Sequence, residues 1–359
     1  MLNELKYTIF IIYIVYTQTN MELLFHLIIF IIILLFYIHI TNQCNTSEDL
    51  EIYELNYTDN KYLQEVCDVK QPTIFNYKDI NPDFFSKFNK NTIEDFDTYD
   101  IKIKDNRDYF ENSVIDFVYL PFRSASTLMN TDSKSNYFTE DNHTFIDDAN
   151  LTHIFKTNDM FLKPYYTIQT KYDYISGSKK SYLPFRFHKH NRYFVAVHSG
   201  NIRIKLSPYK SSKYLHTIYD YDCYEFRSPI NIWEPQRHYF NEMNKMKFLE
   251  FDVNEGQIIY IPSYWWYSIM FLDSSTVLSG ITYNNIISTI SNSKDIGLYY
   301  LQQSNTITKV ANTFENHTII NNNDNNNENN ENNDNDDKIM ENDTITEEIT
   351  NKNSNIITI

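Results

Sequence analysis

His188 and His190 are the residues of this chain whose type and spacing come closest to metal chemistry. Imidazole is a frequent metal ligand, and residues two apart on a β-strand lie on the same face, so one ion could contact both rings. The same spacing also fits two neighbours on a solvated face, and Arg192 follows them closely. The residues alone leave both interpretations open and favour the second.

Other catalytic chemistry has no matching pattern. The chain lacks a Gly-x-Ser-x-Gly elbow, a phosphate-binding loop and a Cys-x-x-Cys pair, so serine hydrolases, nucleotide-binding enzymes and thiol oxidoreductases are not indicated. Trp233, Trp265 and Trp266 fit either an aromatic binding surface or, more commonly, a core. The acidic and aromatic loop at residues 219–225 fits either a protein contact or a solvated connection.

The charge balance argues against a nucleic-acid partner. The formal net charge is −16 over 359 residues, whereas a protein that binds phosphate backbones needs a basic face. Ten carboxylates and one lysine lie between Asp324 and Glu348, so nine of those negative charges belong to the C-terminal tail. Residues 304–359 are rich in Asn, Asp and Glu. We expect this tail to be disordered, because its few apolar residues cannot offset the entropy lost on ordering.

Residues 23–40 form an almost unbroken apolar run, and as a helix this run would be roughly 27 Å long, close to the thickness of a bilayer core. The run predicts a transmembrane helix over 23–40, preceded by a cytosolic or interfacial segment at 1–22. A cleaved signal peptide and a buried core helix are the alternatives. Residues 41–60 are polar and acidic and are predicted to be a stalk.

The flanks of this helix predict its orientation. Lys6 precedes the helix, and by the positive-inside rule it favours a cytosolic N-terminus with the body lumenal or external. Asn-x-Ser/Thr sequons agree with that side. A disulfide between Cys67 and Cys223 stays open, because an odd number of cysteines gives no pairing. The candidate glycosylation sites are Asn45, Asn56, Asn142, Asn150, Asn316 and Asn342.

Past residue 61 the chain is predicted to fold mainly as β-strands, because short Tyr- and Ile-rich runs alternate with turn residues. Residues 202–206 alternate between aliphatic and basic side chains, which places the aliphatic face in the core. Gly200 predicts a hairpin between the strands at 193–198 and 202–206. The other predicted strands lie at 72–75, 115–120, 247–253, 257–261 and 277–283, and the predicted helices follow residue 81 and cover 286–303.

Two segments carry a family resemblance. Residues 256–269 read Gly-Gln-Ile-Ile-Tyr-Ile-Pro-Ser-Tyr-Trp-Trp-Tyr-Ser-Ile and resemble the last metal-binding strand of the JmjC and cupin-like family, in which a histidine follows Trp-Trp. Residues 182–200 resemble the family's first metal-binding strand. The resemblance implies a domain over 61–303 with an N-terminal α+β region and a double-stranded β-helix, or jelly roll, at about 165–290. Residues 210–229 and 264–268 are also similar to membrane-anchored cupin-like proteins of giant DNA viruses.

The family's chemistry requires Fe(II) held by His-x-Asp/Glu and a distal histidine, with a lysine for the co-substrate 2-oxoglutarate. Aligned on Gly200, the resemblance places Phe187 and Lys189 in the proximal ligand positions, Tyr267 in the distal position and Ile202 in the lysine position. None of these four is the expected type. In this register the metal site is degenerate and no cofactor is expected.

A shift of one residue changes this assignment, because it moves every strand side chain to the other face. His188 and His190 then take the proximal positions as His-x-His, although the shift requires a bulge before Gly200 and still leaves Tyr267 in the distal position. Which side chains at residues 187–190 point into the barrel therefore decides the chemistry.

These features predict a single-pass membrane protein whose degenerate cupin-like domain is a non-enzymatic binding or structural module of a viral or host-derived membrane. The alternative is an Fe(II)/2-oxoglutarate-dependent protein hydroxylase using His188 and His190. A third class is a sugar or polyamide binder with Tyr267 and Trp266 lining the mouth of the barrel.

Overall fold

The computed structural model describes residues 2–88, 96–110 and 115–304. The chain divides into two units, Met1–Gln303 and Ser304–Ile359. The tail predicted to be disordered, with the sequons at Asn316 and Asn342, lies outside the described residues apart from Ser304.

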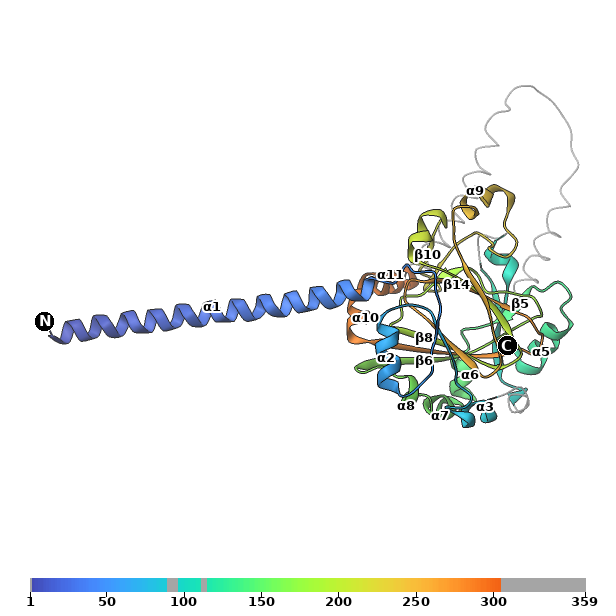
Figure 1. Ribbon diagram of the computed structural model, residues 1–359, viewed down its shortest axis with the longest axis horizontal. Helices are drawn as coiled ribbons and strands as arrows, with labels where there is room; N and C mark the ends of the chain where they lie inside the picture. Colours follow the sequence, from blue (N-terminus) through green and yellow to red (C-terminus); the bar gives the residue numbers. More distant parts are fainter. Residues whose placement is uncertain (1, 89–95, 111–114, 305–359) are drawn as a thin grey trace, which may run out of the picture. The chain divides into compact units, whose positions relative to one another are not determined.

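Within the described residues the strands form two sheets (Figure 1). The larger sheet has the strand order β1-β2-β13-β8-β15-β6-β5-β3-β4, and the smaller sheet has the order β10-β11-β7-β14-β9-β12. The strands are β1 (Tyr53–Glu54), β2 (Thr73–Asn76), β3 (Asp100–Asp105), β4 (Phe117–Pro121), β5 (Tyr137–Thr139), β6 (Thr167–Gly177), β7 (Arg186–Phe187), β8 (Arg192–Ser199), β9 (Ile202–Ser207), β10 (Ile218–Asp220), β11 (Glu225–Arg227), β12 (Leu249–Val253), β13 (Gln257–Ile261), β14 (Trp266–Phe271) and β15 (Val277–Asn285).

The helices lie before, between and after these strands. They are α1 (Leu2–Cys44), α2 (Asn60–Asp68), α3 (Pro82–Lys87), η2 (Asn106–Tyr109), α5 (Phe122–Thr131), α6 (His143–Asp148), α7 (Thr152–Lys156), α8 (Asp159–Leu162), η3 (Tyr209–Tyr214), η4 (Arg237–Tyr239), α9 (Phe240–Met243), α10 (Ile286–Ser291) and α11 (Ser293–Ser304).

The two sheets pack face to face around an inner core. Alternate residues of β8, Tyr193, Val195 and Val197, meet Ile204 of β9 and Tyr267 of β14 in this core. The alternation predicted for residues 202–206 is confirmed, because the aliphatic side chains are fully buried and the basic ones are only half-buried. This arrangement is the predicted jelly-roll class of fold.

Both sheets are also covered on their outer faces. Phe194 and Ala196 of β8 belong to a second cluster, in which they pack with side chains from α2, α3 and α5 to α8. Outside the smaller sheet, Phe187 and Trp266 pack with residues of the long connection between β9 and β12. A strand buried on both faces reads as a continuous apolar run, which explains the sequence of β8.

The predicted hairpin at Gly200 is wrong. β8 pairs with β13 and β15, whereas β9 pairs with β12 and β14, so the two strands belong to different sheets. Gly200 is still required, since its φ is +75° and an added Cβ would lie 2.7 Å from the hydroxyl oxygen of Thr276. The turn has the composition of a hairpin but carries the chain across the inner core. The aliphatic faces of β8 and β9 bury more apolar surface when they face each other from two sheets than when they lie side by side in one.

The N-terminal region differs from its predicted division. α1 is continuous from Leu2 to Cys44 and includes both the apolar run at 23–40 and the residues expected to precede the membrane. Its part Met21–Cys44 is long and apolar enough to cross a membrane. The segment 41–60, predicted to be a stalk, contributes β1, which pairs with β2 at Tyr53 and Thr73. The body therefore begins close to the end of α1.

Candidate functional site

The strand pairing at β7 decides which side chains face the barrel interior. Arg186 pairs with Tyr267 and Phe187 pairs with Trp266 across β7 and β14. Directly paired residues share a face of the sheet, so Phe187 and Tyr267 lie on opposite faces. Tyr267 belongs to the inner core, whereas Phe187 packs on the outside against Trp266 at a ring-centroid distance of 4.9 Å.

The register that placed Phe187 and Lys189 beside Tyr267 is therefore wrong. Lys189 lies away from the interior, with its ammonium 2.7 Å from Asp295 and 4.3 Å from the ring centroid of Phe226. Counting back from Gly200 assumed one unbroken strand, but residues 188–191 lie outside any strand and separate β7 from β8. Ile202 is buried in the inner core, as an apolar residue rather than a co-substrate ligand.

His188 takes an interior position beside Tyr267. Its ring lies 5.0 Å from the ring of Tyr193 and 5.9 Å from that of Tyr267, between centroids. The pairing of β15 with β8 also shifts register between Val277 and Leu278, which leaves His198 as an extra residue just before Gly200. This is the bulge that the alternative register required.

Both ring nitrogens of His188 are already engaged. Nδ1 accepts the backbone N–H of His190 at 3.2 Å, and Nε2 lies 3.1 Å from the carbonyl oxygen of Ile261. A carbonyl can only accept, so Nε2 carries the proton and donates it. Burial, together with the neighbouring His190, holds the pKa of His188 well below its usual range. A metal ion would have to displace one of these hydrogen bonds to reach a lone pair.

His190 lies against His188, with their ring centroids 5.4 Å apart, so the predicted histidine pair does come together. Its Nδ1 accepts from the side-chain amide of Asn284 at 3.3 Å. Burial, and secondly the charge of Lys171, lowers the pKa of His190 to about 4. Among the described residues no group of three His, Cys, Asp or Glu side chains could hold a metal ion. With Tyr267 in the distal position, these donors do not fit a facial-triad iron site.

A network of buried ion pairs lies beside Tyr267. The Arg186 guanidinium donates to Glu140 and Glu225, each at 2.8 Å from Nη1, and Nη2 reaches the second oxygen of Glu140. Nε of Arg186 donates to the Tyr267 hydroxyl at 3.3 Å. Lys104 joins the network through Glu140 at 2.9 Å. The chain's own side chains therefore occupy the space beside Tyr267.

The network is stable in its charged form because its charges balance. Burial alone would raise the pKa of Glu140, but Arg186 and Lys104 outweigh it, and the net pKa is lowered. Burial opposes the charge of Arg186 as well, yet Glu140 holds the pKa of Arg186 well above its ordinary value. Arg186 and Lys104 thus face the carboxylate of Glu140 in a site of low solvent access. The carboxylate of Glu225 lies within ion-pair distance of both Arg186 and Arg227.

Sequence reasoning did not identify this network. Glu140 follows β5 and lies 46 residues before Arg186, and Lys104 on β3 lies 82 residues before it, so no local pattern joins them. The sequence did contain one indication of the position of Arg186. This residue lies between two phenylalanines and two residues before His188, so in an extended chain its side chain points to the same face as that of His188. The loop 219–225 is not simply a solvated connection, because its last residue, Glu225, is buried and ion-paired with Arg186.

Burial also decides the role of two tryptophans and of one sequon. Trp265 and Trp266 are fully buried, so they form core rather than an exposed binding surface, and Trp266 and Tyr267 cannot line one mouth because they face opposite sides. Asn142 is buried too, donating to Thr139 and to the carbonyl of Tyr174. The folded protein could not carry a glycan there without losing these bonds. The three cysteines Cys44, Cys67 and Cys223 are free, so the disulfide considered between two of them is not formed.

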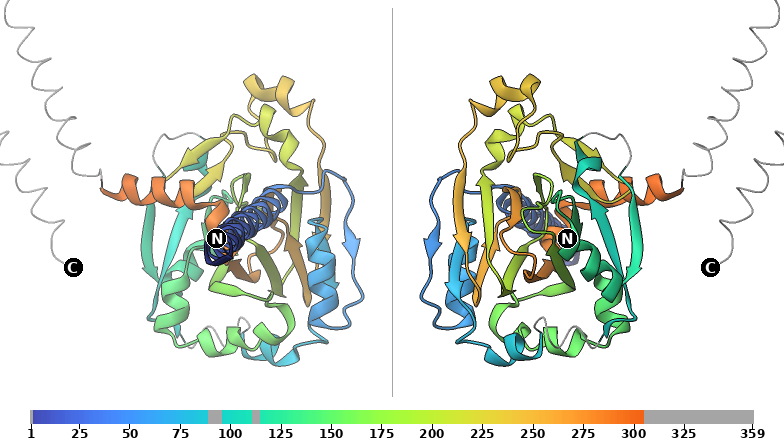
Figure 2. Two further views of the ribbon diagram at one scale, coloured as in Figure 1. Left: turned by 90° about the vertical axis from the view of Figure 1, so that its left-hand side faces the viewer. Right: turned by 90° about the vertical axis from the view of Figure 1, so that its right-hand side faces the viewer.

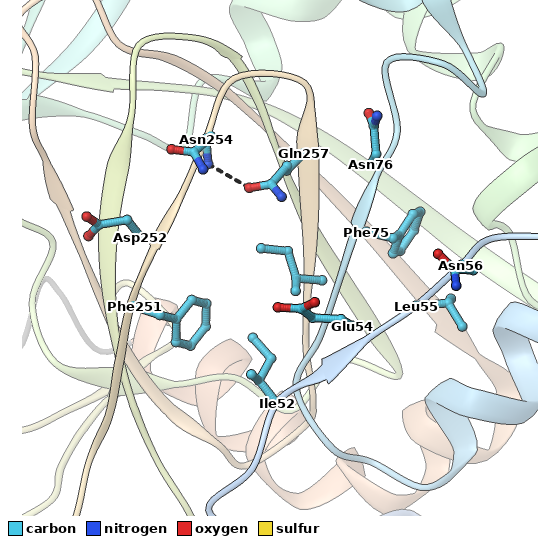
Figure 3. Close-up of a pocket in the computed structure, with 11 residues that line it drawn as sticks. Ile52, Glu54, Leu55, Asn56, Phe75, Asn76, Phe251, Asp252, Asn254 and Gln257 are labelled. Carbon is cyan, nitrogen blue, oxygen red and sulfur yellow. Dashed lines mark hydrogen bonds between the residues drawn. The ribbon is translucent and has the colours of Figure 1, made fainter.

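A groove of about 370 Å³ lies between the edge strands of the two sheets, β1 and β12 (Figure 3). The side chain of Glu54 projects into it beside Ile52 and Phe251 (Figure 3). Its apolar floor and polar rim are formed by Ile52, Glu54, Leu55, Asn56, Ile74, Phe75, Asn76, Phe251, Asp252, Asn254 and Gln257. A second hollow of about 390 Å³ lies beside α5, and Ser126, Thr127, Ser274 and Ser275 are among the residues that line it.

We expect the buried histidines to lower the stability of the body as the pH falls below about 6.5. Burial lowers the pKa of His198 from 6.5 to about 3, and it lowers the pKa of His190 to about 4. The unfolded chain therefore binds protons that the folded chain excludes, so this stability is complete above pH 6.5 and is lost as the pH falls toward the folded pKa. Urea unfolding of the full chain in detergent, measured across this pH range, checks the slope.

A matched pair of variants isolates the buried ring. His198→Phe keeps an aromatic side chain among Phe84, Phe85 and Phe88 and removes one titrating group, so the acid slope should fall by about one bound proton. His153→Phe, at an exposed histidine, should leave the slope unchanged. An unchanged slope in the His198 variant would contradict the assignment.

Comparison with known proteins adds one match. Residues 185–289 match the family model of the cupin-like domain. This match begins just before β7 and ends in α10, so it covers β7 to β15 and includes Arg186, His188 and Tyr267. None of the curated proteins compared with the chain matches it.

Proposed function

We propose that this chain, which carries a cupin-like domain behind an apolar N-terminal helix, is a single-pass membrane protein whose domain binds a partner and catalyses no reaction. The observation that supports this most directly is the Arg186 network. The position beside Tyr267 is filled by Arg186, ion-paired with Glu140 and Glu225. A guanidinium fixed by two carboxylates repels a metal cation and leaves it no carboxylate ligand.

The membrane part of the proposal rests on α1. Its segment Met21–Cys44 would be roughly 36 Å long as a helix, enough to span a bilayer core with some tilt. Lys6 supports a cytosolic N-terminus, with the body lumenal or external. Exposed sequons at Asn45, Asn56 and Asn150 agree with that side. The similarity to membrane-anchored proteins of giant DNA viruses favours a virion membrane or the host endoplasmic reticulum.

The groove at the sheet edges supports a binding role. Glu54 and Asp252 are carboxylates, and four amide side chains line the same rim above apolar residues. Asp252 is already paired with Arg203 at 2.7 Å, which leaves Glu54 as the carboxylate that projects into the groove (Figure 3). These groups suit an amphiphilic ligand with a cationic or amide group.

Purified full chain in detergent should bind less than stoichiometric iron and form no succinate when it is supplied with Fe(II), 2-oxoglutarate and oxygen. The reason is that His188 has no free lone pair and the distal position is Tyr267. Iron content by elemental analysis and succinate formation check this result. The double variant His188→Ala and His190→Ala should behave like the parent chain.

The competing function is a protein hydroxylase that uses Fe(II) and 2-oxoglutarate at the same histidines. It requires stoichiometric iron that is lost in the double variant and kept in His153→Ala, a control at an exposed histidine, together with succinate production. That combination would overturn the non-enzymatic proposal.

A further inference from the structure

The end of α1 is fixed directly to the body. Lys70 is buried, and its ammonium donates to the backbone carbonyls of Asn42, Gln43 and Asn45, at 3.0 Å and 2.8 Å for the last two. The last carbonyls of a helix have no partner within the helix, and a cation there also meets the negative end of the helix dipole. Lys70 therefore holds the last turn of α1 against the domain, with no flexible spacer between them.

The part of the body next to this junction is α10. It lies where α1 reaches the domain, as Figures 1 and 2 show from different sides. The helix follows β15, and Asn285 at the end of β15 pairs with Thr167 at the start of β6. The residues just before and within the start of β6 are therefore neighbours of the first turn of α10.

These two neighbouring segments expose large apolar side chains. Tyr166 is 86 % exposed, and Ile286 is 49 % exposed on α10. Ile286 and Ile290 are four residues apart and so share one side of the helix. A soluble surface rarely gathers apolar side chains of this size, and a contiguous group of them marks an interaction site. The group, here called the α10 face, consists of Tyr165, Tyr166, Ile168, Ile286 and Ile290.

The length of α1 determines what the α10 face meets. The apolar run ends at Ile40, and the contacts with Lys70 begin at Asn42, within one helical turn. When 23–40 fills the hydrocarbon core, the start of the domain lies at headgroup depth, since the interfacial layers add several ångströms on each side. Tyrosine is the residue that membrane proteins enrich at this depth.

We infer that the α10 face inserts into the lipid interface, so that the domain lies on the bilayer surface and its orientation is fixed. The occupant is the headgroup and upper acyl region of the membrane that α1 crosses, and the inference rests on the proposed membrane anchoring. Contact through Tyr165, Tyr166, Ile168, Ile286 and Ile290 is apolar, so it needs no anionic lipid.

Depth-dependent fluorescence quenching in nanodiscs tests this inference on the full chain. Cys44 and Cys223 are first replaced by serine, and an environment-sensitive fluorophore is placed at Tyr166→Cys or, as the control, at Phe240→Cys. Phe240 is a half-exposed aromatic residue of α9, which lies on a different side of the body from α10 (Figure 1). Lipids spin-labelled near the headgroup should quench the label at 166 severalfold more than the label at 240.

Two further results are expected. Ile286→Asn with Ile290→Asn should reduce the quenching at 166, and phosphatidylserine added to phosphatidylcholine should leave it unchanged. Equal quenching at 166 and 240 in a carbonate-resistant chain would overturn the docking inference and leave the anchor intact. Extraction of the chain by carbonate would overturn the anchor, and the docking with it. Quenching only with phosphatidylserine would overturn the apolar basis of the contact.

Discussion

Replacing Arg186 with methionine should lower the free energy of unfolding by about 3–5 kcal/mol, because it leaves Glu140 and Glu225 buried without their shared cation. Glu140 is only 2 % exposed, so water cannot replace the lost partner. Lys104 remains beside Glu140, and Arg227 remains 3.9 Å from Glu225, but neither cation bridges the two carboxylates as Arg186 does. Urea unfolding of the full chain in detergent, followed by tryptophan fluorescence, measures the loss.

The control is Arg203→Met, which removes a cation of the same kind from an exposed pair. Arg203 contacts Asp252 at 2.7 Å, but both side chains are 42 % exposed, so water solvates Asp252 after the change and the expected loss is much smaller than for Arg186. A similar small loss in both variants would mean that solvent reaches the Arg186 network. In that case the interior beside Tyr267 would be open to a ligand, and the Arg186 network would not exclude catalysis.

Replacing Trp266 with alanine should also cost about 3–5 kcal/mol, since it removes a fully buried indole from the outer face of the smaller sheet. The ring packs against Phe185 and Phe187 at centroid distances of 5.4 Å and 4.9 Å. Its Nε1 donates to the hydroxyl of Ser212 at 2.8 Å, which ties the connection after β9 to the sheet. The same unfolding measurement applies, with circular dichroism to check that the variant folds.

Trp266→Phe separates the packing from the hydrogen bond. Phenylalanine keeps most of the ring contact and loses only the donor to Ser212, so the expected loss from the hydrogen bond is about 1 kcal/mol, with a smaller cavity cost added. If the phenylalanine and alanine variants lose the same stability, the hydrogen bond would be the main contribution and the packing assignment would be wrong. The two variants together test whether the Trp-Trp motif serves the core rather than a binding surface.

Several features of the protein follow from local sequence patterns. The alternation at 202–206, the strand that begins at Trp266 and the apolar run of α1 depend on residues close together in the chain. Such periodicities reflect which side of one element is buried, and that property does not require knowledge of distant partners. The cupin-like class of fold could be inferred from these patterns, together with the family resemblance.

The register at residues 186–190 could not be inferred in the same way. It depends on the break between β7 and β8, and on β8 lying in the larger sheet while β7 and β9 lie in the smaller one. A turn such as Ser199-Gly200-Asn201 specifies a reversal of direction but not the sheet in which the next strand pairs. The predicted hairpin, and the placement of Phe187 and Lys189 beside Tyr267, differ from the structure for this one reason.

The sequence by itself determined the local features of this protein: the buried face at 202–206, the apolar run of α1 and the tyrosine that follows Trp265 and Trp266. Only the tertiary structure decided what stands beside Tyr267, because Glu140, Arg186 and Glu225 come from three separate strands or their ends. A buried charge network needs partners that balance one another, and those partners meet only when the sheets have paired. The physical reason is that periodicity is a property of neighbours in the chain, whereas charge compensation is a property of neighbours in space.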